Sequence, residues 1–428
     1  MRVEIFGRTA EKVKNHGARG CGYIGKIVSY PGGRYEEIGE VHVDLTEPHC
    51  MLVLGKRGTG KSYTLGVLLE GFSLLEPEVR NRLAIVVVDT MSVFHSLKTA
   101  NNEPWECNRM KDFKDLCPRP LDNVKIALPK LAEERMMSRG VQPFKDVELT
   151  MRPWEISHDS WMSLFGLKPT DAHGSLLLDV LSRVEEKERE WGLGDIRREL
   201  ADAEGALEEK RGLLSLLDMV EASKIFSSSK GSLVEPGVIT VLDISYMGRF
   251  GGLDLRAFLV SHIAKMLLKE RTLQTTMEMQ SQAGLVSPAQ SSDFPLVWLV
   301  IDEAHLFLPS GGTCLSTGAL IDWIKLGRHP GLSIVLATQE PSALHDTAIR
   351  QADLVISHQI TAEPDVAALA KARQSFMTKD RDLASLVSMM DSRRGLAIVF
   401  DDKTRKMEYC MIRPRVTLHT GMDASALG

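Results

Sequence analysis

Eight residues near the start of the chain have the types and the spacing that bind a phosphate group. The segment 55–62 reads GKRGTGKS, which matches the pattern G-x-x-x-x-G-K-[ST]. Glycines let successive backbone N–H groups approach phosphate oxygens, where a side chain would intrude. Lys61 then reaches these oxygens, and the Ser62 hydroxyl can bind Mg²⁺. We therefore predict a site for ATP and Mg²⁺ that uses Gly55, Gly58, Thr59, Gly60, Lys61, Ser62 and Tyr63.

A second group of polar residues directly follows a predicted buried strand far along the chain. The apolar run 296–301, LVWLVI, ends in Asp302 and Glu303. Such a pair suits the chemistry of phosphate transfer, because Asp302 can hold Mg²⁺ through water while Glu303 polarises the attacking water. His305 has two interpretations, a contact to phosphate or partner and a simple helix N-terminal residue, and we favour the second.

Two further strand ends carry polar residues that could serve the same site. The run 333–337 closes on Thr338 and Gln339, and the Gln339 amide is suited to contact both the γ-phosphate and the attacking water. The run 83–88 ends at Asp89, which either helps to order Mg²⁺ or accepts hydrogen bonds from its own loop. The sequence leaves both alternatives for Asp89 open.

The elements that position these residues are predicted by long apolar runs alternating with helical patterns. Continuous runs rich in β-branched residues are typical of parallel strands buried on both faces. Ligands of such sheets bind at the carboxyl ends of the strands, where the polar residues stand. We therefore predict the α/β class, with a mostly parallel sheet that carries the phosphate loop.

The alternating pattern is interrupted twice, which suggests additional units. We predict a short β-barrel-like segment at 1–48, core segments at 49–100 and 236–405, an inserted, mostly helical subdomain at 101–235, and a C-terminal strand and tail at 406–428. A long amphipathic helix is expected at 255–271. The following stretch, 272–293, is rich in Gln, Ser and Thr and is expected to be a surface loop.

Composition excludes few classes of protein. The net charge of −5 leaves nucleic-acid binding open, because a basic channel can exist in an acidic molecule. No apolar run reaches the roughly 18 residues that span a bilayer, and the N-terminus lacks the apolar segment of a signal peptide. We expect a cytoplasmic protein without membrane insertion. Six cysteines without a C-x-x-C pair argue against a zinc site.

Taken together, these motifs resemble the HerA/FtsK group of motor ATPases, and most closely HerA. The resemblance rests on HCMLVLGKRGTGKS, on LVIDEAHLFLP followed by KLGRHPGLSIVLATQEPS, and on the tail MIRPRVTLHTGM. It implies a RecA-like P-loop ATPase core in which Arg328 acts in trans on the ATP of a neighbouring subunit. We expect no second RecA-like lobe in the 126 residues after Asp302, and we therefore expect a neighbouring subunit to complete the site. The family implies a homo-hexamer.

The leading hypothesis is an ATP-driven translocase for duplex DNA that works with a nuclease partner in end processing or antiphage defence. One alternative is a coupling or secretion ATPase of the conjugation type. Another is an assembly scaffold in which ATP only sets the oligomeric state. Glu303 discriminates between these classes, because a scaffold needs no general base.

Overall fold

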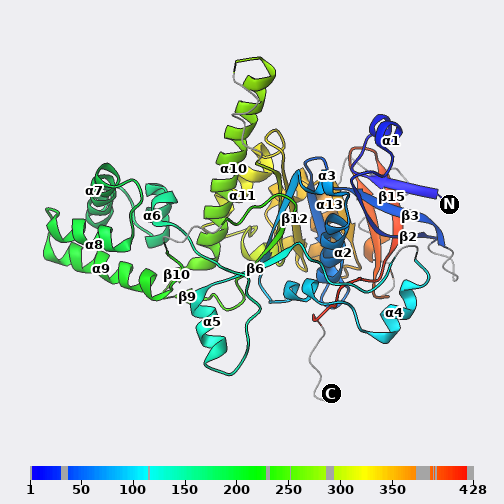
Figure 1. The fold of residues 1–428 in the computed structure, drawn as a ribbon, viewed down its shortest axis with the longest axis horizontal. Coiled ribbons are helices and arrows are strands. Elements are labelled where there is room, and N and C mark those ends of the chain that lie inside the picture. Colours follow the sequence, from blue (N-terminus) through cyan, green and yellow to red (C-terminus); the bar gives the residue numbers. More distant parts are fainter. Residues whose placement is uncertain are drawn as a thin grey trace.

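The fold is built on one long mixed β-sheet, as the computed structural model shows (Figure 1). The structure describes residues 2–29, 37–113, 116–227, 232–250, 252–285, 294–372, 386–388, 390 and 393–421. Within these ranges, thirteen strands lie side by side in the order β1-β3-β2-β15-β14-β13-β4-β12-β11-β5-β8-β6-β7. Their bounds are β1 Arg2–Phe6, β2 Cys21–Val28, β3 Glu37–Asp44, β4 Cys50–Leu54, β5 Leu83–Asp89, β6 Val124–Leu128, β7 Val147–Glu148, β8 Ile239–Asp243, β11 Leu296–Ile301, β12 Leu332–Thr338, β13 Leu354–Ser357, β14 Leu396–Asp401 and β15 Lys406–Ile412.

The eight strands from β13 to β7 in this order are all parallel. The prediction of an α/β fold with a mostly parallel sheet is thus confirmed. Parallel strands end at the same edge of a sheet, so the residues that follow β4, β5, β11 and β12 meet there. This edge gathers the phosphate loop, Asp89, Asp302 and Gln339.

Helices cover both faces of the parallel strands, which explains why these strands are apolar throughout. On one face, α2 packs Leu65 and Phe72 against Val53 and Val300. On the other face, α10 and α11 pack against Leu299 and its neighbours. The helix bounds are α1 Ala10–His16, α2 Lys61–Ser73, α3 Pro77–Arg80, α4 Pro104–Met110, α5 Lys130–Met137, α6 His158–Phe165, α7 Ala172–Lys187, α8 Leu193–Asp202, α9 Leu207–Ala222, α10 Leu255–Gln282, α11 Thr317–Leu326, α12 Asp346–Gln351 and α13 Glu363–Ala372.

The N-terminal strands continue the main sheet instead of closing a small barrel of their own. β2 pairs with β15 from the C-terminal part of the chain, and β3 and β1 extend the sheet beyond it. The physical reason is that β2 finds its second partner, antiparallel β15, almost 400 residues away, with Cys410 opposite Ile27. The strands in the described part of residues 1–48 therefore form one end of the main sheet.

Residues 101–235 contain helices α4 to α9, of which α6 to α9 stand apart from the sheet on one side (Figure 1). The same stretch also adds β6 and β7 to the edge of the main sheet. A separate two-stranded ribbon, β9 Arg249–Phe250 with β10 Leu253–Asp254, precedes α10. The division of the chain into domains remains a prediction.

The expectation of a loop at 272–293 is wrong for its first half. Helix α10 runs without interruption to Gln282 and projects from the body of the molecule (Figure 1). The stretch 272–282 contains no glycine or proline to end the helix, and Gln274 is buried and donates a hydrogen bond to Glu278 one turn further on. The rest of that expectation, 286–293, lies outside the described residues.

Candidate nucleotide-binding site

The phosphate loop lies between β4 and α2 with the backbone shape that its glycines permit. Gly55, Gly58 and Gly60 have φ values of 154°, 77° and 112°. A side chain at Gly55 would also have no room, because its Cβ would lie 2.5 Å from Thr59 Oγ1 and 2.7 Å from His358 Cβ. Thr59 closes the loop by donating from its hydroxyl to the Lys56 carbonyl at 2.7 Å. The loop is thus a backbone cradle at the N-terminus of a 13-residue helix.

Lys61, Ser62 and Asp302 meet beside this cradle. The Ser62 hydroxyl donates a 2.9 Å hydrogen bond to Asp302 Oδ2. Burial lowers the pKa of Lys61, although the carboxylates of Glu303 and Asp302 oppose this effect. Burial likewise raises the pKa of Asp302, while Ser62 and Lys61 counteract the rise. The structure therefore brings together the cation and the two oxygen donors that the sequence predicted.

Glu303 is held in a backbone conformation that non-glycine residues seldom adopt. Its φ is 52°, in the left-handed region, and such outliers cluster at functional sites. The Gln339 backbone N–H donates to its carboxylate, yet Oε2 is buried without a hydrogen-bond partner among the described residues. Burial and the neighbouring Asp302 raise its pKa. A half-buried carboxylate with one oxygen that accepts no hydrogen bond is suited to accept a proton.

His305 supports the tip of β12 from a short 3₁₀ turn, Ala304–Leu306. Its Nδ1 lies 3.0 Å from Thr338 Oγ1 and 3.6 Å from Glu303 Oε2. Burial lowers its pKa. His305 is thus a residue of the strand-tip network, next to the predicted base, and Gln339 follows Thr338 at the same edge as a half-buried side chain.

Asp89 is a loop carboxylate in this structure. Its Oδ1 accepts from the Met91 N–H at 3.1 Å, and its Oδ2 accepts from the Phe94 N–H at 2.8 Å. Burial raises its pKa to about 7, with Asp243 and Asp302 adding to the rise. Both oxygens are therefore occupied in shaping the loop after β5, which favours the second of its two interpretations.

His358 lies directly beneath the phosphate loop and was missed in the sequence. The ring is fully buried, with Nδ1 2.9 Å from the Leu396 carbonyl and Nε2 2.9 Å from Thr64 Oγ1. Burial lowers its pKa to about 4, so the ring is neutral near pH 7. Its place immediately after β13, at the same edge as the other site residues, was the available signal.

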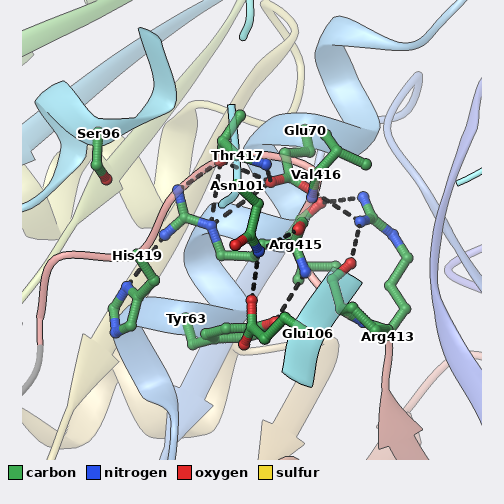
Figure 2. Close-up of polar contacts among 12 residues, drawn as sticks. Tyr63, Glu70, Ser96, Asn101, Glu106, Arg413, Arg415, Val416, Thr417 and His419 are labelled. Carbon is green, nitrogen blue, oxygen red and sulfur yellow. Dashed lines mark hydrogen bonds and ion pairs between the residues drawn. The ribbon is translucent and has the colours of Figure 1, made fainter. Parts of the chain in front are cut away.

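Tyr63 turns its side chain away from the phosphate loop, so only its backbone lies beside the cradle. Its hydroxyl accepts a 2.7 Å hydrogen bond from the Arg415 N–H, and its ring meets His419 edge-on (Figure 2). Arg415 and His419 belong to residues 413–419, which we call the C-terminal segment. This segment follows β15 and lies along α2 (Figure 2).

Glu70 anchors the C-terminal segment from inside α2, and it too was missed in the sequence. Its carboxylate accepts from Arg413 Nη1 at 2.7 Å, from the Thr417 N–H at 2.9 Å and from Thr417 Oγ1 at 2.7 Å (Figure 2). The side chain of Glu70 is 0% exposed and that of Arg415 1%, with 3.5 Å between them. A lone acidic residue in the apolar run LLEGF was the signal that could have revealed it.

Arg328 is the one predicted catalytic residue that the structure keeps away from this edge. It precedes β12, which runs parallel to β4 with Ile334 opposite Cys50 and Thr338 opposite Leu54. The seven residues of β12 separate Arg328 from the phosphate loop by about 20 Å, at about 3.3 Å per residue. Arg328 is exposed. Within one subunit it therefore cannot contact the nucleotide bound by the same chain.

The residues present fit a nucleoside triphosphate with Mg²⁺. A Cβ at Gly55 would collide with Thr59 and His358 and so disturb the loop, and Lys61 supplies the cation for phosphate oxygens. The Ser62 hydroxyl and the Asp302 carboxylate are hard oxygen donors of the kind Mg²⁺ prefers, and they are already adjacent. When bound, Mg²⁺ would neutralise charge on the phosphates.

A strand, phosphate loop and helix followed by an acidic strand tip define the class of P-loop nucleoside triphosphatases. A family model described as the central domain of the helicase HerA matches residues 25–247, just over half of the chain. The chain therefore belongs to the HerA family. A model described as zonular occludens toxin (Zot) matches residues 248–396. Comparison with curated proteins gave no match.

Comparison with solved structures gave matches of low sequence identity, and the first of those described below shares this fold. VirB4 of Thermoanaerobacter pseudethanolicus is 13% identical, with a TM-score of 0.52 over 95% of this chain and 98% of that one. The bacterial conjugative coupling protein TrwB is 14% identical, with a TM-score of 0.49 over 87% and 89%. The genome packaging NTPase B204 of Sulfolobus turreted icosahedral virus 2 is 11% identical, with a TM-score of 0.36 over 86% and 97%. Within the described residues, no helix combines the length and the apolar character that crossing a membrane requires.

Proposed function

We propose that the protein hydrolyses ATP with Mg²⁺ and uses the energy to move duplex DNA through a homo-hexameric ring. The observation that carries the proposal is the buried Oε2 of Glu303, which has no hydrogen-bond partner among the described residues and is held by a left-handed backbone beside Lys61 and Asp302. A protein that only binds ATP has no need to place a strained carboxylate there. The cost of such a conformation, about 1–3 kcal/mol, is understandable if the carboxylate is a general base.

In the proposed reaction, the backbone of the phosphate loop and Lys61 hold the β- and γ-phosphates. Water attacks the γ-phosphorus, and the bond to the β,γ-bridging oxygen breaks to release ADP. Glu303 accepts the proton that the water loses, and its raised pKa favours this transfer. Gln339, at the neighbouring strand tip, would orient the water and contact the γ-phosphate. Ser62 and Asp302 would hold Mg²⁺.

The placement of Arg328 supports the proposed ring. Its position at the far edge of the sheet excludes its own nucleotide, so its contribution to catalysis requires the next subunit. Charge on the transferred phosphoryl group is often stabilised by an arginine from a neighbouring chain. A ring of identical subunits would bring each Arg328 to the adjacent phosphate loop, and the HerA family supports six of them.

The family also supports duplex DNA as the cargo and a nuclease as the partner, in DNA end processing or antiphage defence. ATP turnover measured with no DNA, with duplex DNA and with single-stranded DNA at one fixed salt concentration tests the cargo. Salt must be fixed because contacts to DNA phosphates weaken steeply with ionic strength. Stimulation by duplex DNA would support the proposal. Basal hydrolysis without stimulation would favour a coupling or secretion ATPase, and ATP binding without hydrolysis would favour a scaffold.

A further inference from the structure

A buried arginine of α10 holds the turn that carries Arg328. The side chain of Arg271 is 2% exposed. Its Nε donates a 2.7 Å hydrogen bond to the Pro330 carbonyl, and its Nη1 donates one of 2.7 Å to the Phe294 carbonyl. The first carbonyl belongs to the turn between α11 and β12, and the second to the segment just before β11. One guanidinium therefore ties the starts of two adjacent strands together.

The turn itself is packed tightly against this guanidinium. Gly331 has a φ of 83°, and a Cβ there would lie 2.3 Å from Leu296 Cδ2 and 3.5 Å from Arg271 Nη2. The Leu332 N–H donates to the Gly327 carbonyl at 2.8 Å and closes the turn. The turn's backbone is thus fixed by these contacts, while the side chain of Arg328 in the same turn is exposed.

The next turns of α10 complete the surroundings of Arg271. Glu278 Oε1 lies 3.4 Å from Nη1 and also accepts a 3.1 Å hydrogen bond from Gln274 Nε2. Thr275 Oγ1 lies 3.4 Å from Nη2. An unpaired buried charge is costly, and here a carboxylate and two carbonyls offset that cost. This arrangement requires the helix to continue beyond Arg271, as it does.

We infer that Arg271 is a positioning residue for Arg328, which it places for contact with the ATP of the neighbouring subunit. The inference rests on the proposed shared site. Arg271 lies at the amino-terminal edge of β11 and β12, so it does not touch the nucleotide of its own chain and acts through the Pro330 backbone. Geometry of this kind matters because a misplacement of about 1 Å can lower a rate about 100-fold.

The test compares Arg271→Met, Arg271→Lys and Arg328→Ala in the full-length protein. Arg271→Met should lower kcat by about 100-fold, while the affinity for a non-hydrolysable ATP analogue stays at the wild-type level. Arg271→Lys keeps the charge but donates to fewer carbonyls, so its kcat should fall in between. The control is Lys269→Met, which removes an exposed cation from the same turn of α10 and should leave kcat unchanged.

Two further measurements separate positioning from general loss of structure. The double variant of Arg271→Met and Arg328→Ala should be no slower than Arg328→Ala alone, because both changes abolish the same interaction, the contact of Arg328 with the neighbour's ATP. Subunits carrying Glu303→Gln still offer a correctly placed Arg328, so mixing them with Arg271→Met subunits should restore turnover. If Arg271→Met does not fold, the double-variant comparison and the subunit mixing are both made with Arg271→Lys.

The outcomes also distinguish this inference from the proposed function. If Arg328→Ala hydrolyses ATP like the wild type, the shared site is wrong and the inference fails with it. If Arg328→Ala is inactive while Arg271→Met is fully active, only the inference is overturned. An additive double variant, or mixed subunits that remain inactive, would likewise overturn it, because Arg271 would then act on something other than Arg328.

Discussion

The Ser62 hydroxyl donates a 2.9 Å hydrogen bond to Asp302 Oδ2, although 240 residues separate the two in the chain. Ser62 ends the phosphate loop as the second residue of α2, and Asp302 follows β11. Between β4 and β11 in the sheet lies only β12. The two residues therefore meet because parallel strands deliver their carboxyl ends to one edge. Their contact sets side by side two oxygen donors that would hold Mg²⁺.

Replacing Ser62 with alanine should raise the Mg²⁺ concentration required for ATP hydrolysis by at least about 10-fold, since one oxygen donor is lost. Turnover measured against total Mg²⁺ at saturating ATP checks this. Ser182→Ala, which changes an exposed serine on α7, is the control and should leave the Mg²⁺ dependence unchanged. An unaltered Mg²⁺ curve for Ser62→Ala would show that this hydroxyl does not hold the ion.

The variant Glu303→Gln should keep ATP binding but lose about 10²–10⁴-fold in turnover, because the amide cannot accept the proton of the attacking water. Binding of a fluorescent ATP analogue and steady-state phosphate release measure the two properties separately. Glu340→Gln neutralises a nearby exposed carboxylate and should retain turnover. If Glu303→Gln hydrolyses ATP at the wild-type rate, the motor function must be abandoned.

The sequence revealed the residues of the nucleotide edge because each follows a recognisable strand. Gly55, Asp302 and Gln339 stand directly after apolar runs, and a parallel sheet brings such positions together whatever the intervening chain does. Local pattern was sufficient for these residues. The same reasoning would have included His358, had the end of the shorter strand β13 been given equal weight.

Contacts between distant segments could not be predicted in this way. Glu70 binds Arg413 across 343 residues, and no local pattern identifies an acceptor for a buried arginine. The pairing of β2 with β15 also joins segments that lie far apart in the chain, so no local pattern predicts it. Because of this pairing, the segment predicted as a barrel extends the main sheet instead. The length of α10 was misjudged because the buried environment of Gln274 comes from tertiary packing, which composition does not report.

Replacing Glu70 with alanine should lower the free energy of unfolding by about 3–5 kcal/mol, because it leaves the buried Arg413 and Arg415 without their carboxylate. Urea denaturation followed by fluorescence at pH 7 measures the change. Glu208→Ala, at an exposed position of α9, is the control. A loss below about 1 kcal/mol would place the interaction among weak surface pairs.

The same carboxylate predicts a dependence on pH. Burial alone would raise the pKa of Glu70, but Arg413, Arg415 and Thr417 outweigh it and lower the pKa overall. A lowered folded-state pKa gives stability that is present above the unfolded pKa and lost as the pH falls through the folded one. The destabilisation caused by Glu70→Ala should therefore shrink below about pH 4. A constant difference down to pH 3 would contradict the pairing.

His358 should make the protein less stable in mild acid. Its pKa is lowered to about 4 in the fold, mainly by burial, with Lys61 adding to this effect and the Leu396 carbonyl opposing it. The unfolded chain has an ordinary histidine pKa of about 6.5. Between these values the unfolded state binds a proton that the folded state does not, so stability rises with pH across this window.

The variant His358→Asn removes this titration, and the difference in the free energy of unfolding between wild type and variant should isolate it. As the pH rises from 4 to 6.5, the free energy of unfolding of the wild type should increase relative to that of the variant by up to about 1.4 kcal/mol per pH unit. Above pH 6.5 the difference should stay constant. Urea denaturation at pH 4.5, 5.5, 6.5 and 7.5 checks this, with His329→Asn as the matched substitution at an exposed histidine. A flat difference for His358→Asn would mean that the ring titrates alike in both states, and the phosphate loop would then rest on a charged imidazole below pH 6.5.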